Sequence, residues 1–253
     1  MTVRQFISDI NEKVRAYGID SWIPPKTIYS NAQSAISSFL SRSNSASRLI
    51  YKNDRALTEI DGIEMQEVPV TTCDLGDTYN CERLMRSKLP LPNIYTSKFG
   101  DIVPEVMSIN FGQEYTNCFT PKQYKAISKR EFQDPKLRYF YILNNFLYIP
   151  IRKASERSPE QIRILALFRD RYEVYKFVQA IGGCPECTPQ EPCKKLLDFE
   201  MVLPDFLEDD VKGKVTQDLA NVYLKIVPDE YPNLEGVSKN NQKDLQDRKI
   251  TNS

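Results

Sequence analysis

Apolar and polar side chains alternate at helical spacing over the first residues of the chain. Apolar residues recur every three or four positions, at Val3, Phe6, Ile7, Ile10, Val14 and Tyr17. Thr2 and Gln5 have the spacing of a capping box, and Gly18 supplies a C-terminal stop. The pattern predicts one helix of about four turns with a buried apolar face.

Two further segments show the same period. One opens at Pro24 and Pro25 and carries an apolar stripe at Ile28, Ala32, Ala35, Ile36, Phe39 and Leu40. Its other face is serine-rich, which fits either a solvated surface or close packing against a neighbouring subunit. The other opens at Leu203-Pro204-Asp205, where Asp205 and Glu208 have capping-box spacing, and its stripe comprises Leu207, Val211, Val215, Leu219, Val222 and Ile226. We expect this last helix to pack on the other helices.

From about Gln66 the pattern changes to short apolar runs that are broken by Pro, Gly and Asn, which is typical of strands and turns. Residues 138–149 contain two apolar runs around Asn144-Asn145. Because asparagine tolerates positive φ angles, this segment predicts a hairpin with a type I′ turn. A further strand is predicted over residues 161–168, and a helix over residues 170–181 that ends at Gly182-Gly183.

These elements predict an α+β protein: a helical-bundle scaffold with an inserted β-rich domain and an extended C-terminal arm. The expected divisions are N-terminal helices in residues 1–65, the β-rich insertion in 66–168, C-terminal helices in 169–227 and a tail in 228–253. The C-terminal helices include a cysteine-bearing loop at residues 182–194.

The tail has too little apolar surface to fold by itself, so it either docks on a partner or has no fixed position. Tyr231, Leu234 and Val237 recur every third residue with Pro228 and Pro232 nearby, which is the period of polyproline II. An extended arm could present these side chains to a groove. The alternative is ordinary spacing in a flexible terminus. We expect residues 228–237 to dock and the last dozen or so residues to stay mobile.

Composition narrows the function. The 253 residues contain 34 basic and 34 acidic side chains, so no net charge attracts nucleic acid or anionic membranes. No apolar run is long enough to span a bilayer, and no signal peptide is recognised. The chain has no histidine, which excludes Ser-His-Asp and Cys-His catalysis, and it has none of the common phosphate-binding glycine motifs. We therefore expect no enzyme and no cofactor. An acidic cluster at Glu208, Asp209 and Asp210 is better explained by the first turn of a helix.

Three of the six cysteines lie close together in the sequence, at Cys184, Cys187 and Cys193. Such a group could hold a structural zinc ion, with Cys73, Cys81, Cys118 or a carboxylate as the fourth ligand. A redox role would need a thioredoxin-like context that is absent from the sequence. The third explanation is packing or a loop staple. A zinc-binding interaction module is therefore the alternative function.

The order of short segments resembles a recurring structural protein of crAss-like phages, the tailed phages of gut Bacteroidales. These segments, spread over residues 66 to 245, are VPVTTCDL, SKLPLPNIY, DIVPEVMSI, NNFLYIPI, IRILALF, LPDFLEDDVKGKVTQDLANVYL and VPDEYPNLEGVSKNNQKDL. Each piece is short and composed of common residues, so their order carries the resemblance.

The resemblance implies a virion protein of the neck, a ring protein of the head-to-tail connector or portal-adaptor type. Its implied partners are its own copies in a ring, commonly twelve as a homododecamer, the portal protein, adjacent neck or tail rings, and DNA in the lumen during ejection. No membrane partner is implied, and assembly is expected in the host cytoplasm. In this view Pro228, Tyr231, Pro232, Leu234 and Val237 bind the partner.

Overall fold

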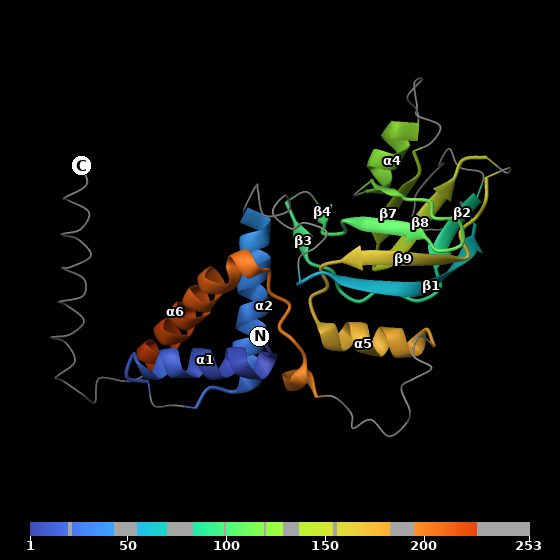
Figure 1. Ribbon diagram of the computed structural model, residues 1–253. Coiled ribbons are helices and arrows are strands. Elements are labelled where there is room, and N and C mark those ends of the chain that lie inside the picture. Colours follow the sequence, from blue (N-terminus) through green and yellow to red (C-terminus); the bar gives the residue numbers. More distant parts are fainter. Residues whose placement is uncertain are drawn as a thin grey trace, which may run out of the picture.

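The computed structural model describes residues 1–19, 22–42, 55–69, 83–98, 100–118, 120–128, 137–153, 156–182 and 195–226. Three helices, α1 (Val3–Arg15), α2 (Pro25–Arg42) and α6 (Glu208–Ile226), lie on one side of the molecule and a strongly curved sheet lies on the other (Figure 1). We call the three helices the helical unit. The α+β class predicted from the sequence is confirmed.

The helical unit joins the two ends of the described chain around one hydrophobic core. The predicted stripes supply most of it, including Phe6 and Ile10 of α1, Ile28 and Ile36 of α2, and Val211 and Val215 of α6. The capping box forms as expected, because Gln5 N donates to Thr2 Oγ1 and Thr2 N donates to Gln5 Oε1. Asp205 does not open the last helix as a cap. A 3-10 turn, η2 (Asp205–Leu207), follows Pro204 and leads into α6.

Seven strands form the main sheet, in the order β5-β9-β1-β2-β8-β7-β6. Their bounds are β1 (Thr58–Val68), β2 (Arg83–Ser87), β5 (Glu105–Ser108), β6 (Thr116–Asn117), β7 (Tyr139–Leu143), β8 (Phe146–Ile151) and β9 (Gln161–Ala166). A separate pair, β3 (Thr96–Ser97) and β4 (Gly100–Asp101), lies beside α2. The first strand begins at Thr58, so β structure starts ahead of the expected boundary at residue 66.

The curvature has two local causes. β1 pairs with β9 through its first half and with β2 through its second half, and its register shifts between Ile60 and Ile63. Gly62 adopts a φ of 78° at this bulge, where an L side chain would be strained. At the other end, Ser108 N donates to Gln113 O and Tyr115 N donates to Val106 O. Because residue 115 leads directly into β6, the two edges of the sheet meet and the sheet is nearly closed.

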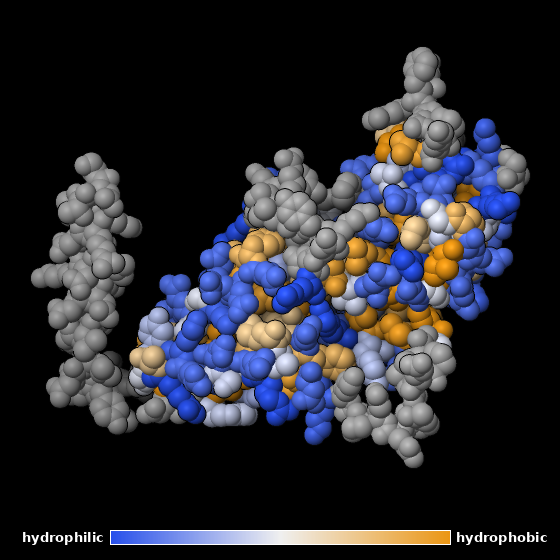
Figure 2. Space-filling view, viewed as in Figure 1, coloured by the Kyte–Doolittle hydropathy of each residue, from blue (hydrophilic) through white to orange (hydrophobic). Residues whose placement is uncertain are grey.

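Side chains on the inner face of the sheet form a second core, together with α5 (Arg171–Ala180). Phe140, Leu147, Ile149, Ile162 and Ile164 come from the strands, and Val174 and Phe177 come from α5. On the face shown in Figure 2, hydrophobic residues gather between the strands and α5, whereas the visible surface of α1 and α6 is largely hydrophilic. The helix predicted over residues 170–181 is thus present, but it packs on the sheet.

A short helix, α4 (Pro121–Ser128), covers the outer face of β7 and β8 and was missed in the sequence. Tyr124 of α4 packs against Tyr141, and Tyr141 stacks on Tyr148 with ring centroids 5.3 Å apart. A signal for this helix exists, because Thr120 precedes Pro121 and its hydroxyl accepts a hydrogen bond from Gln123 N. The hairpin of β7 and β8 is confirmed, with φ angles of 51° and 63° at Asn144 and Asn145.

Candidate assembly surfaces

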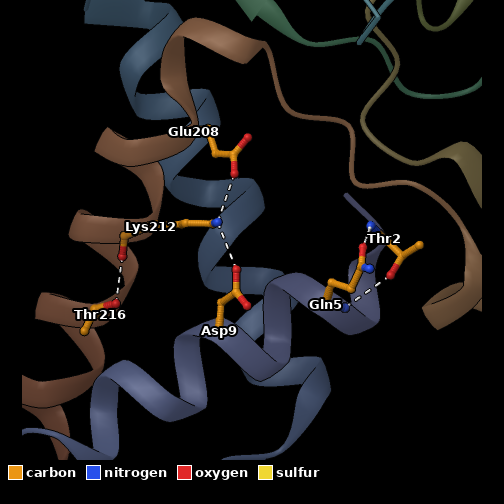
Figure 3. A network of polar contacts seen from close by, with 6 residues as sticks. All are labelled: Thr2, Gln5, Asp9, Glu208, Lys212 and Thr216. Atoms are coloured by element: carbon orange, nitrogen blue, oxygen red, sulfur yellow. Dashed lines mark hydrogen bonds and ion pairs between the residues drawn. The ribbon is translucent and has the colours of Figure 1, made fainter.

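A partly buried lysine joins α1 and α6 where the two helices cross (Figure 3). Lys212 Nζ lies 2.9 Å from both Asp9 Oδ2 of α1 and Glu208 Oε1 of its own helix. Burial disfavours the charged ammonium, but the two carboxylates outweigh it and raise the pKa of Lys212 above its usual value. Glu208, from the acidic cluster noted in the sequence, is therefore one partner of this structural ion pair.

The N-terminus is tied to the segment that precedes α6. Val3 N donates to Phe199 O and Met201 N donates to Met1 O, both at 2.9 Å, which forms a short antiparallel bridge. Arg4 pairs with Asp198 at 2.8 Å and lowers the pKa of that carboxyl. This bridge holds the 3-10 turn η1 (Leu196–Asp198) beside the start of α1.

The apolar stripes predicted for α1 and α6 are exposed at one corner of the helical unit. Tyr17 is 59% exposed and Val222 is 52% exposed, although both were expected to continue buried stripes. Beyond the Asp9–Lys212 crossing, α1 and α6 run toward the same corner, so their C-terminal ends lie together (Figures 1 and 3). Trp22, the one tryptophan of the chain, is 71% exposed in the connection that follows α1, and Leu224 is 52% exposed. We call these four exposed side chains, Tyr17, Trp22, Val222 and Leu224, which lie in or follow the last turns of α1 and α6 in the sequence, the helical corner.

An apolar groove of about 520 Å³ runs along α2. It is lined by Val3, Pro25, Lys26, Tyr29, Ser30, Gln33, Leu196 and Leu197, and we call it the α2 groove. The groove was hard to predict from the sequence, because its walls come from segments near both ends of the chain. The Leu196-Leu197 pair between lysines and Asp198 is the one signal that could have marked it.

The junction between the helical unit and the sheet is polar and closely bonded. Gln33 Nε2 donates to Arg169 O at 3.3 Å, and Arg171 bridges Glu200 and the carbonyl of Arg55. Asp170 caps α5 by accepting from Tyr172 N, and burial raises its pKa. Burial and the nearby Asp170 raise the pKa of Tyr29 as well. These contacts keep the α2 groove in a fixed position relative to the sheet.

The arm residues predicted to bind a partner, Pro228, Tyr231, Pro232, Leu234 and Val237, lie outside the described residues, as do Cys184, Cys187 and Cys193. Cys118, considered as a fourth metal ligand, packs in the core beneath α4, where burial raises its pKa to about 11. No group of three metal-ligating side chains occurs within the described part of the chain. Among the described helices, none is long and apolar enough to cross a bilayer.

Comparison with known proteins agrees with the resemblance seen in the sequence. The model of a family described as phage tail ring protein 2 matches residues 5–242, which is nearly the whole chain. No curated protein matches. A ring protein associates with copies of itself and is part of the virion. The chain therefore belongs to the phage tail ring protein 2 family, the structural ring proteins of crAss-like phages.

Proposed function

We propose that the chain is the subunit of a neck ring that acts as an adaptor between the portal and the tail and encloses part of the DNA passage. The main support for the proposal is the helical corner, because the apolar stripes of α1 and α6 end there in exposed side chains. Burying a Val or Leu side chain stabilises a complex by about 1.5–3 kcal/mol, so these exposed apolar side chains favour contact with a protein partner.

A ring of identical subunits supports this use of the corner. In a closed ring each subunit presents one surface to one neighbour and a different surface to the other, so an uncovered patch on one side needs a distinct acceptor. We expect twelve copies, which would match a twelvefold portal. The balanced charge of the chain fits a passage through which DNA slides without being held.

The C-terminal arm completes the proposal. The tail follows α6 in the sequence, so the proposed docking segment is attached to the helix that carries Val222 and Leu224. We propose that residues 228–237 order on a partner, with Tyr231 and Leu234 as anchors. Ordering that occurs only on docking suits stepwise assembly after DNA packaging.

The first test removes the arm. Deleting residues 228–253 should leave a folded monomer, with an unchanged circular dichroism spectrum, that no longer joins purified portal protein in native mass measurements. Deleting only residues 240–253 is the matched control, and it should leave assembly intact because the docking segment remains. Portal binding by the shorter chain would refute the role of the arm.

The second test addresses the helical corner. Replacing Val222 and Leu224 together by Lys should weaken self-association by at least about tenfold, because two apolar side chains lose their burial. Asn221→Lys and Gln217→Lys, on exposed positions of the same helix, provide a control with the same added charge. Sedimentation over a concentration series measures the association. Equal association of both pairs would mean that the corner is not a subunit contact.

A further inference from the structure

The α2 groove has the properties of a preformed peptide site. Its volume of about 520 Å³ is within the range of ligand pockets, and Pro25, Tyr29, Leu196 and Leu197 give it an apolar floor and walls. Lys26 and Ser30 lie among its polar lining groups. Lys26 makes no ion pair among the residues that the structure describes, so one cation faces the groove without a carboxylate partner.

The walls of the groove are held before anything binds. Tyr29 is 9% exposed and its hydroxyl bonds with Gln33 and Asp170. Leu196 and Leu197 belong to η1, which the Arg4–Asp198 pair and the Val3–Phe199 hydrogen bond fix to α1. Because little reorganisation is needed, the binding free energy of an occupant is not spent on shaping the site.

The sequence of the arm fits this groove. Residues 228–237 read PDEYPNLEGV, with apolar side chains at Tyr231 and Leu234 and three acidic residues without a basic one. The groove contains Lys26, and Lys195 directly precedes the lining residue Leu196 in the sequence. The nearby carboxylates are already paired, Asp198 with Arg4 and Glu200 with Arg171. An acidic, apolar, extended segment is therefore complementary in charge and in surface.

The length of the arm permits exchange between copies, and closure of a ring favours it. The arm follows α6 in the sequence, and the C-terminal end of α6 lies with that of α1 (Figure 1), whereas the groove includes Val3 at the N-terminal end of α1. Thirteen helical residues separate these ends by about 20 Å. Ten extended residues span about 33 Å, which exceeds this separation, so the length of the arm permits docking in the groove of its own subunit or of an adjacent one. A ring needs one donor surface and one different acceptor surface on each copy, and the arm and the groove provide such a pair.

We propose that the α2 groove of each subunit receives residues 228–237 of the neighbouring copy. This proposal rests on the proposed function, because it names the acceptor for the arm. Tyr231 and Leu234 enter the apolar part of the groove, and Lys26 faces the acidic side chains around them. Docking of the arm on the portal or on its own subunit are the competing outcomes.

Photo-crosslinking of the full chain tests the proposal. The photoreactive amino acid p-benzoylphenylalanine replaces Ser34, an exposed residue of α2 one helical turn beyond the lining residue Ser30, so that the groove itself stays open. Equal amounts of ¹⁵N-labelled and unlabelled protein are then mixed, assembled and irradiated. Trypsin releases residues 27–42 with the crosslinker and residues 226–239 with the arm, since no lysine or arginine lies within the arm peptide. We expect these two peptides to be joined in mixed-isotope pairs. The same replacement at Ser8, an exposed serine of α1 outside the groove, should give no arm crosslink.

The other outcomes are distinct. Only same-isotope pairs would mean that the arm folds onto its own groove, and absence of the arm peptide would mean that it docks elsewhere; either result overturns the inference. If the arm does not crosslink to the groove but deletion of residues 228–253 still abolishes assembly, the groove inference fails while the proposed function stands. If the deletion leaves assembly intact, the role of the arm fails independently of the groove.

Two substitutions test arm docking in the groove without a crosslinker. Ser30→Trp fills the groove, and Lys26→Glu reverses its charge; each should weaken self-association by about tenfold. The controls are Ser8→Trp and Lys13→Glu, which make the same changes at exposed positions of α1. Circular dichroism confirms that each variant is folded. Association that is unchanged in both groove variants would contradict the proposal.

Discussion

Lys212 shows how one side chain can fix the geometry of two helices. Its ammonium bonds two carboxylates from different helices while it is itself 12% exposed, and Thr216 Oγ1 donates to its carbonyl oxygen one turn later. A single partly buried cation with two partners constrains the crossing point more than several exposed pairs would. The arrangement could not be read from the sequence, because residues 9 and 212 are brought together only by the fold.

We expect Lys212→Met to lower the free energy of unfolding by about 1–2 kcal/mol, since two charge-assisted hydrogen bonds are lost and two half-exposed carboxylates remain. Lys214→Met, on the same helix, removes only the exposed pair with Asp218 and should cost less than about 0.5 kcal/mol. Urea unfolding of the three proteins measures both differences. Equal losses of unfolding free energy would show that the Asp9–Lys212 contact stabilises the fold no more than the exposed Lys214–Asp218 pair.

Buried phenols make the protein sensitive to alkali. Burial raises the pKa of Tyr29 and Tyr95 well above the usual range and raises that of Tyr115 to about 12. The folded chain therefore keeps protons that the unfolded chain releases near pH 10. The stability that these groups contribute is fully present below about pH 10 and is lost as the pH rises toward 12.

Tyr115→Phe should reduce this loss. Between the pKa of a tyrosine in the unfolded chain and its pKa in the folded chain, the free energy of unfolding falls by about 1.4 kcal/mol per pH unit. From about pH 10 to 12, this free energy should therefore fall less steeply in the variant, by that amount. Urea unfolding at several pH values gives the slope, and absorbance at 295 nm follows phenol ionisation. Parallel curves for the two proteins would exclude a contribution from Tyr115.

At the scale of elements, the hairpin of β7 and β8 illustrates which local structure is encoded locally. Asn144 and Asn145 both have positive φ, as the type I′ turn requires, and the turn is exposed. Asn145 is also bonded to Asn93, so it has a tertiary role. The Asn144 side chain makes no hydrogen bond among the described residues. A substitution there therefore tests the positive φ angle alone.

Asn144→Gly should change the free energy of unfolding by less than about 0.5 kcal/mol, because glycine adopts this conformation without strain. Asn144→Val should cost about 1–2 kcal/mol, because a β-branched side chain clashes with the backbone there. Thermal unfolding compares the pair. A valine variant as stable as the glycine variant would show that the turn rearranges.

The elements that were predicted are those with a local signal: the apolar period and cap of α1, the stripe of α2 and the turn of the hairpin. Of the elements that were missed, α4 had a local signal at Thr120 and Pro121, but the first half of β1 depends on a distant partner. The first half of β1 is a strand because β9 pairs with it, about a hundred residues later. Val222 and Tyr17 extend their stripes in sequence, yet nothing in the described molecule covers them.

At the scale of the whole molecule, the sequence predicted the α+β class and the ring family, but neither the near closure of the sheet nor the groove. Closure depends on hydrogen bonds between β5 and residues 113–115, which have no distinctive pattern. The groove depends on residues 3, 25–33 and 196–197 meeting in space. The corner and the groove are on the unit built from both chain ends, so the surfaces that we assign to assembly exist only when the whole chain has folded.

The joining of the chain ends has a consequence during translation. A ribosome delivers α1 roughly 200 residues before α6, a delay of about 10–40 s at ordinary elongation rates. Throughout that interval the apolar stripes of α1 and α2 lack their final cover, whereas the strands between them can already pair. The nascent chain therefore lacks the complete helical unit, and with it the surfaces that we propose for assembly, until α6 has been synthesised.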